Sequence, residues 1–188
     1  GRGLICVPMQ SARLKELRIP MMVQENTAPL ATAFTVSVEA RHHVTTGISA
    51  HDRSQTVAAL IDAQTRPDDL TRPGHMFPLK AMDGGVLVRA GQTEGVVDLA
   101  KLAGLYPAGV ICEIMSEDGT MARLPQLKKI GSDHSLKIIT VADLISYRMR
   151  NDKLVNRVAA SKLPTSYGDF QAIAYMTSIG PEEHIALV

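Results

Sequence analysis

Aromatic side chains are scarce in this chain of 188 residues, which contains no tryptophan and has an aromatic content of 4%. Proteins that stack nucleic-acid bases depend on such rings, so we expect no nucleic-acid partner. The formal net charge of +1 gives neither a basic nor an acidic field that would draw the chain to a nucleic acid or a membrane surface. No apolar run is long enough to span a bilayer, so we expect no membrane partner either.

Cysteine is also rare, with Cys6 and Cys112 as the two examples. Both lie in apolar runs that are typical of strands, and neither has partners at zinc-binding spacing. We therefore expect buried free thiols in a reducing compartment: the cytoplasm, or the plastid if the source is a plant. The chain does not begin with Met, and Gly1 leads almost directly into the apolar run from Leu4 to Val7. We expect further residues before position 1.

The composition is otherwise that of an ordinary globular protein, with 45% hydrophobic and 21% charged residues. Ser49 and Asp52 have capping-box spacing and predict the start of a helix. Asp83-Gly84-Gly85 predicts a hairpin turn between two strands, and Arg66–His75 predicts a loop. Further helices are expected at 11–17, 93–103, 125–133 and 141–151, and strands at 4–8, 33–40, 76–82, 86–89, 109–115 and 137–140.

Because helices and strands interleave and a hairpin is expected, we predict an α+β fold in three layers, a mixed twisted sheet with helices packed on it. Residues 1–150 form the expected main domain, and the polar and basic stretch 151–162 is the expected linker. Two further strands at 171–175 and 185–188 then indicate that residues 163–188 open a second domain that is cut short.

The segment Arg89-Ala90-Gly91-Gln92-Thr93-Glu94 lies between an expected strand and an expected helix. Gly91 permits close backbone approach, the helix N-terminus offers free N–H groups, and Arg89 adds a fork of donors that suits a phosphate. The alternative is a plain capped helix start with a surface arginine. The spacing alone does not decide between a phosphate site and this structural role.

Two further side chains could move protons. His75 follows Pro73-Gly74 and could act as a general acid or base, although a loop histidine bonded to a carbonyl is the simpler explanation. Glu113 lies in the apolar run 110–115, where burial would raise the pKa of its carboxyl toward the range useful for proton transfer. Glu113 could equally occupy a solvent-facing position of a strand.

The same residues resemble the motifs of one enzyme family, 3,4-dihydroxy-2-butanone-4-phosphate synthase, over about residues 1–150. The matching motifs, in order, are Thr46-Gly47-Ile48-Ser49-Ala50-His51-Asp52-Arg53, Thr71-Arg72-Pro73-Gly74-His75-Met76-Phe77-Pro78-Leu79, Gly84-Gly85-Val86-Leu87-Val88-Arg89, Thr93-Glu94, Leu102-Ala103-Gly104-Leu105, Pro107-Ala108-Gly109-Val110-Ile111-Cys112-Glu113 and Asp118-Gly119-Thr120-Met121-Ala122. The tail from Lys162 to Val188 resembles the start of GTP cyclohydrolase II, as in bifunctional riboflavin biosynthesis proteins. No Cys follows Cys112, so the zinc site of a cyclohydrolase is not present in these residues.

The resemblance implies a lyase of riboflavin biosynthesis that converts ribulose 5-phosphate to 3,4-dihydroxy-2-butanone 4-phosphate and formate with Mg²⁺ or Mn²⁺. It implies that His75 and Glu113 are the catalytic residues. It further implies that Arg89, Ala90, Gly91, Gln92, Thr93 and Glu113 bind the substrate. The family is a homodimer with active sites at the subunit interface, so the resemblance also implies that His75 serves the pocket of the neighbouring chain.

Two departures from the family pattern concern the metal. The family motif at 89–93 ends in Gly-His-Thr, and that His is a metal ligand, whereas this chain has Gln92. An amide oxygen can bind Mg²⁺, but a neutral amide is a weak ligand. The other family ligand is a Glu in an Arg-Glu-Asn-Glu-Gly-Asp motif, which does not occur in this chain. The alternatives to an active synthase are an impaired homologue that serves as a structural or dimerisation domain for a cyclohydrolase partner, and an unrelated phosphate-binding module.

Overall fold

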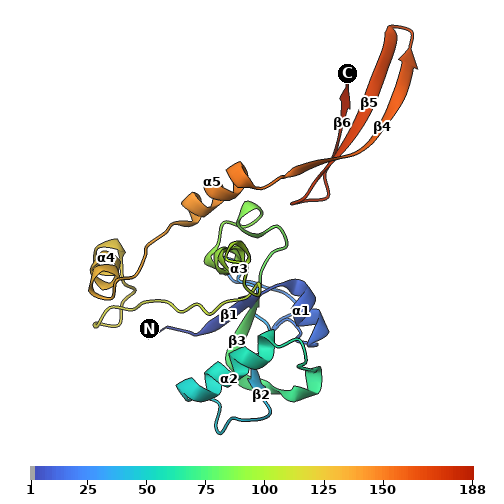
Figure 1. The fold of residues 1–188 in the computed structure, drawn as a ribbon. Coiled ribbons are helices and arrows are strands. Elements are labelled where there is room, and N and C mark those ends of the chain that lie inside the picture. The colour runs from blue at the N-terminus through green and yellow to red at the C-terminus, as the bar shows by residue number, and fades with distance from the viewer. Residues whose placement is uncertain (1–2) are drawn as a thin grey trace.

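A small mixed sheet lies at the centre of the protein, whose structure is a computed structural model that describes residues 3–188 (Figure 1). Its strands are β1 (Cys6–Met9), β2 (Val38–Ala40) and β3 (Leu70–Lys80), in the order β1-β3-β2. β1 runs parallel to β3, and β2 runs antiparallel to it. The mixed sheet and the helices around it confirm the predicted α+β class.

The predicted helices form within one or two residues of their expected bounds. Ser49 caps the second helix as the pattern predicted, because its hydroxyl accepts a hydrogen bond from the Asp52 N–H at 3.0 Å. The helices are α1 (Ser11–Glu16), α2 (Ala50–Ile61), α3 (Gln92–Leu102), α4 (Leu124–Asp133) and α5 (Val141–Asn151).

The main core lies where β1, α1, α2 and β3 meet. α2 packs against β2 and β3, while α3 packs against β1. Each fully buried aliphatic side chain of this core contributes roughly 1.5–3 kcal/mol relative to an exposed one. The core residues include Val7, Met9, Leu14, Leu17, Val38, Leu60, Leu70 and Met76.

β3 begins inside the stretch that the sequence analysis expected to be a loop, so that prediction is wrong. Pro73 and Gly74 are usually strand breakers, yet both lie within Leu70–Lys80. A side chain at position 74 would overlap the main chain of Val38, so the glycine allows β2 and β3 to approach closely. A short 3₁₀ helix, η1 (Pro67–Asp69), leads into β3.

The predicted hairpin around Gly84-Gly85 is also wrong. Gly84 and Gly85 have positive φ angles of 95° and 67°, and the chain continues into the 3₁₀ helix η2 (Gly85–Leu87) in place of a strand at 86–89. Within the described residues, the expected strands at 109–115 and 137–140 are likewise not regular strands. The first is reduced to isolated bridges that pair Ile111 with Cys6 and Met115 with Met121.

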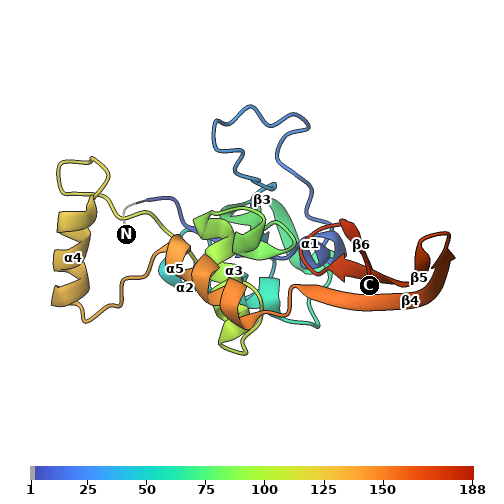
Figure 2. The same ribbon diagram turned by 90° about the horizontal axis from the view of Figure 1, so that it is seen from above.

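A second sheet of three antiparallel strands follows α5 and projects away from the rest of the molecule (Figures 1 and 2). Its strands are β4 (Val155–Thr165), β5 (Gly168–Thr177) and β6 (Glu183–Leu187). The strands predicted at 171–175 and 185–188 are therefore confirmed, although β5 begins three residues earlier than predicted and β6 two residues earlier. β4 begins inside the expected linker 151–162, and the division into two domains stays a prediction.

Both cysteines are free thiols, as expected; Cys6 is buried, whereas Cys112 is only partly buried. Among residues 3–188, none of the helices combines the length and the apolar character that crossing a membrane would require.

Candidate active site

The bend between η2 and α3 lines a cleft of about 560 Å³. Every residue from Arg89 to Thr93 contributes to its wall, and Glu113 faces the same space from a distant part of the sequence. Gly91 is the N-cap of α3, and among the described residues no side chain caps it. The first N–H groups of α3 therefore remain available to an anion, with the positive end of the helix dipole behind them.

Arg89 is held in place on two sides. Its Nη1 donates a hydrogen bond to Glu94 Oε2 at 2.6 Å, and its Nη2 donates to the carbonyl oxygen of Leu30 at 3.0 Å. Glu94 has 0% side-chain exposure, and its other oxygen accepts the N–H of Met82 at 3.0 Å. A guanidinium has five N–H donors, so Arg89 keeps further donors for a ligand in the cleft.

The segment before the bend is fixed in the same way by Asp98. Its Oδ2 accepts the N–H of Val86 and a hydrogen bond from Arg148 Nη1, both at 2.8 Å. Arg148 comes from α5, and it also pairs with Asp152. Burial alone would lower the pKa of Arg148, but its hydrogen bonds and charge interactions with Asp152 and Asp98 raise that pKa. A permanently charged guanidinium therefore joins α5 to the wall of the cleft.

Glu113 is exposed, which agrees with the solvent-facing alternative of the sequence analysis. Its Oε2 accepts the N–H of Leu4 at 3.0 Å, while Oε1 accepts no hydrogen bond within residues 3–188 and is free to take a proton. Cys6 lines the same cleft. Burial, with the charges of Glu113 and Cys112, raises the pKa of the Cys6 thiol to about 11. Cys6 is therefore a protonated thiol near neutral pH and does not act as a nucleophile there.

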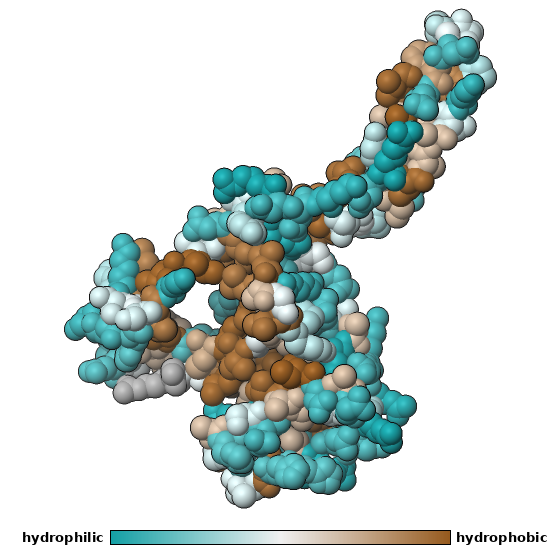
Figure 3. Space-filling view, viewed as in Figure 1, coloured by the Kyte–Doolittle hydropathy of each residue, from teal (hydrophilic) through white to brown (hydrophobic). Residues whose placement is uncertain are grey.

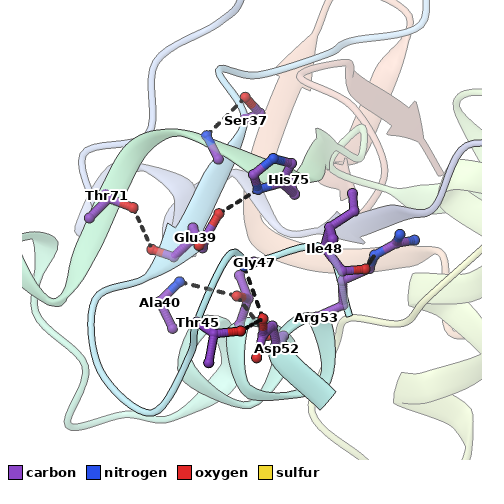
Figure 4. A network of polar contacts seen from close by, with 12 residues as sticks. Ser37, Glu39, Ala40, Thr45, Gly47, Ile48, Asp52, Arg53, Thr71 and His75 are labelled. Carbon is purple, nitrogen blue, oxygen red and sulfur yellow. Dashed lines mark hydrogen bonds and ion pairs between the residues drawn. The ribbon is translucent and has the colours of Figure 1, made fainter. Parts of the chain in front are cut away.

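His75 does not line this cleft. It lies on β3 four residues before Leu79, which does line the cleft, and a strand rises roughly 3.3 Å per residue, so the two positions are about 13 Å apart. Figure 4 shows that His75 instead points toward Glu39 of β2, with 2.6 Å between Nδ1 and Oε2. The sequence analysis did not single out Glu39.

A turn packed beneath Glu39 completes this second cluster (Figure 4). Asp52 Oδ2 accepts the Thr45 hydroxyl and the Gly47 N–H, both at 2.9 Å. Burial would raise the pKa of Asp52, but these hydrogen bonds, together with that from Ser49, lower it below its ordinary value. Asp52 is thus a charged group that fixes the turn 45–49 under the histidine and its partner.

No group of three or more His, Cys, Asp or Glu side chains within residues 3–188 is arranged to hold a metal ion. Gln92 and Glu113, however, both line the cleft of about 560 Å³ and a neighbouring one of about 500 Å³, and each has an oxygen-bearing side chain. Oxygen is the donor that Mg²⁺ prefers, so these side chains fit part of a hydrated magnesium shell.

Comparisons with known proteins identify the family. The sequence profile described as 3,4-dihydroxy-2-butanone 4-phosphate synthase matches residues 1–147. The riboflavin biosynthesis protein RibBA of Synechocystis sp. is 54% identical over 190 residues, covering 100% of this chain and 34% of that protein. The chain belongs to the 3,4-dihydroxy-2-butanone 4-phosphate synthase family. The resemblance derived from its motifs is confirmed.

Solved synthases share the fold. The crystal structure of RibBX, a two-domain 3,4-dihydroxy-2-butanone 4-phosphate synthase from A. baumannii, matches with a TM-score of 0.86 and 47% identity, over 100% of this chain and 55% of that one. A synthase in complex with two magnesium ions matches with a TM-score of 0.75 and 39% identity, over 80% of this chain and 76% of that one. The chain spans about half the length, or less, of the curated relatives it matches.

For a synthase of this family, the structure brings some predicted site residues together and separates others. Arg89 to Thr93 and Glu113 line one cleft, whereas His75 lies outside it within the same chain. Sequence reasoning missed the two acidic partners, Glu39 of His75 and Glu94 of Arg89. Glu39, like Glu113, is a carboxylate within a run of residues typical of a strand. That pattern could have revealed Glu39 as a candidate. The catalytic, substrate-binding and metal roles of the predicted residues stay predictions.

Proposed function

We propose that this chain carries the synthase activity of its family: the conversion of ribulose 5-phosphate to 3,4-dihydroxy-2-butanone 4-phosphate and formate. The observation that carries the proposal is the shared cleft, in which an anion-binding bend and a carboxylate face the same space. Substrate and products balance without another reactant, because the five-carbon sugar phosphate divides into a four-carbon phosphate and formate. The chemistry therefore needs proton transfer and charge stabilisation.

The bend supplies the phosphate site in this proposal. Gln92 and Thr93, the first residues of α3, line the cleft together with Arg89, whose side chain is fixed by Glu94. A fixed guanidinium loses little conformational entropy when it binds a phosphate oxygen. The phosphate anchors the sugar, so that its carbonyl end extends toward Glu113.

Glu113 supplies the base. Its unpartnered Oε1 can accept a proton from the carbon next to the sugar's carbonyl, which gives an enediol, and can return the proton at a later step. Oε2 stays bonded to the N–H of Leu4 at 3.0 Å, which fixes the direction of the carboxyl group. A substitution that prevents this oxygen from acting as a base should abolish turnover and leave the fold intact.

A divalent cation, Mg²⁺ or Mn²⁺, would be held by the amide oxygen of Gln92, with water and substrate oxygens completing its shell. When bound, such an ion supplies positive charge that stabilises the developing enediolate. Gln92 is a weaker ligand than a charged or imidazole side chain, so this chain should need a higher metal concentration than a relative with His at that position.

His75 would act in the cleft of a second copy of the chain. Its side chain is 47% exposed, and the next residue, Met76, lines a second cleft of about 360 Å³ together with Ile5 and Val110. Figure 3 shows an apolar band over the region of α3 and β1 that extends down to α2. Burial of this band between two copies would bring an exposed His75 to another chain's cleft. The cytoplasm is the proposed location.

Formate release from ribulose 5-phosphate with Mg²⁺, measured on the natural full-length protein, tests the activity. We expect turnover by the native protein and none by Glu113→Gln with an unchanged circular dichroism spectrum. The Gln92→His variant distinguishes the impaired-homologue alternative. Turnover by that variant alone would show that the native chain is an impaired homologue. Absence of formate from both would refute the proposed function.

A further inference from the structure

Glu39 and His75 form a carboxylate–imidazole pair in which one partner is enclosed and the other is accessible. The Nδ1–Oε2 distance is 2.6 Å, and the side-chain exposure is 13% for Glu39 and 47% for His75. A carboxylate only accepts hydrogen bonds, so His75 Nδ1 must carry the proton in this contact. The neutral ring then presents Nε2, with its free lone pair, as the atom that can exchange a proton.

Both partners are held by contacts from outside the pair. The carboxylate of Glu39 lies against Gly47, where the backbone has a φ of 79° and any side chain would overlap that carboxylate. The main-chain oxygen of Glu39 also accepts the Thr71 hydroxyl at 3.4 Å. On the other side, the N–H of Gly74 donates to Ser37 Oγ at 3.2 Å and fixes the backbone directly before His75 (Figure 4).

We propose that Glu39 is the positioning residue of His75. It fixes the ring orientation and the tautomer in which Nδ1 is protonated, so that Nε2 faces outward for proton transfer. This proposal rests on the proposed function, because it assumes that His75 exchanges a proton with the sugar phosphate. Glu39 itself touches no substrate. The same device, a carboxylate that orients the ring through Nδ1–H, recurs where histidine acts as a general base.

The tautomer can be measured without substrate. Long-range ¹H–¹⁵N correlation spectra of the histidine rings distinguish a protonated Nδ1 from a protonated Nε2. We expect neutral His75 to be protonated at Nδ1 in the native protein, and to shift toward the Nε2-protonated form or a mixture in Glu39→Ala. Glu16→Ala is the matched control, since it removes a carboxylate that pairs with Arg13 far from the dyad. A native His75 protonated at Nε2, or an unchanged tautomer in Glu39→Ala, would overturn the proposal.

A kinetic cycle separates positioning from a general structural role. Glu39→Gln should lower kcat roughly 10- to 100-fold with little change in KM, because an orienting partner acts through the ring and not through substrate binding. In the background of His75→Asn, Glu39→Gln should cause no further loss. A loss of equal size in both backgrounds would overturn the positioning role. If the native protein releases no formate, the proposed function fails, whereas the tautomer measurement still tests the pair.

Discussion

Glu94 and Asp98 lie one helical turn apart on the buried face of α3, and each accepts a backbone N–H from the segment that precedes the bend. Glu94 Oε1 binds the N–H of Met82 at 3.0 Å, and Asp98 Oδ2 binds the N–H of Val86 at 2.8 Å. Both side chains are almost completely inaccessible, with exposures of 0% and 2%. The helix whose first turn faces the cleft therefore also fixes the chain that delivers Arg89 to it.

Replacement of Glu94 by alanine should weaken both the fold and the phosphate site. The change leaves the N–H of Met82 without a partner and Arg89 without its counter-charge, so we expect the free energy of unfolding to fall by about 3 kcal/mol. Glu94→Gln keeps the shape and one of the two hydrogen bonds, so it should cost less, about 2 kcal/mol. Urea unfolding of the two variants checks this order.

The same pair of variants should differ in KM for the sugar phosphate, because an Arg89 side chain without its partner loses more conformational entropy when it binds phosphate. We expect Glu94→Ala to raise KM more than Glu94→Gln does. Equal stability and equal KM for native protein and Glu94→Ala would show that Arg89 needs no partner.

Asp52 should make the stability of the protein sensitive to acid. The pKa of its carboxyl is lower in the folded protein than in the unfolded chain, whose ordinary value is 3.8. The stabilisation is therefore fully present above the unfolded pKa and is lost as the pH falls through the lower, folded pKa. Asp52→Asn, which cannot ionise, should be less stable than the native protein at pH 7, and the gap should narrow at pH 3. A gap that stays constant in urea unfolding at the two pH values would contradict this account.

Local patterns predicted the helices well and the sheet less well. Ser49 marks a helix start through a contact within a few residues, and that helix forms as expected. The strand through Pro73-Gly74 was missed because the glycine at position 74 is needed for close approach to the main chain of Val38, which is far away in the sequence. The turn at Gly84-Gly85 was misassigned for the same reason, because the N–H of Val86 in the 3₁₀ helix donates its hydrogen bond to Asp98, another distant residue. A single sequence contains no direct record of such distant contacts.

The candidate site follows the same division. The bend at 89–93 was found because its arginine, glycine and helix start are neighbours in the sequence. That Glu113 faces the bend depends on the bridge between Cys6 and Ile111, and that His75 faces Glu39 depends on the pairing of β2 with β3. Neither relationship was visible from residue spacing. The motifs suggested the candidate residues, and the fold places Glu113 at the cleft and His75 beside Glu39.

Gln92 should limit the affinity for metal. Its neutral amide offers one oxygen, so Gln92→His or Gln92→Glu should bind Mn²⁺ more tightly than the native protein, by roughly tenfold for a better first ligand. Titration of Mn²⁺ followed by electron paramagnetic resonance counts the free ion directly and requires no turnover. Gln92→Ala is the matched control and should bind no better than the native chain. Equal affinity in all four proteins would place the metal elsewhere.

The central claim is that Glu113 of one chain and His75 of another act on the same sugar phosphate, and mixing two impaired variants tests it most directly. Glu113→Gln is expected to release no formate from ribulose 5-phosphate, and His75→Asn is expected to release it at only a small residual rate. Unfolded and refolded together in equal amounts, they should recover about a quarter of the native rate, because half of the random dimers are mixed and each mixed dimer contains one intact site. A mixture that is no more active than its two components would contradict a site shared between chains.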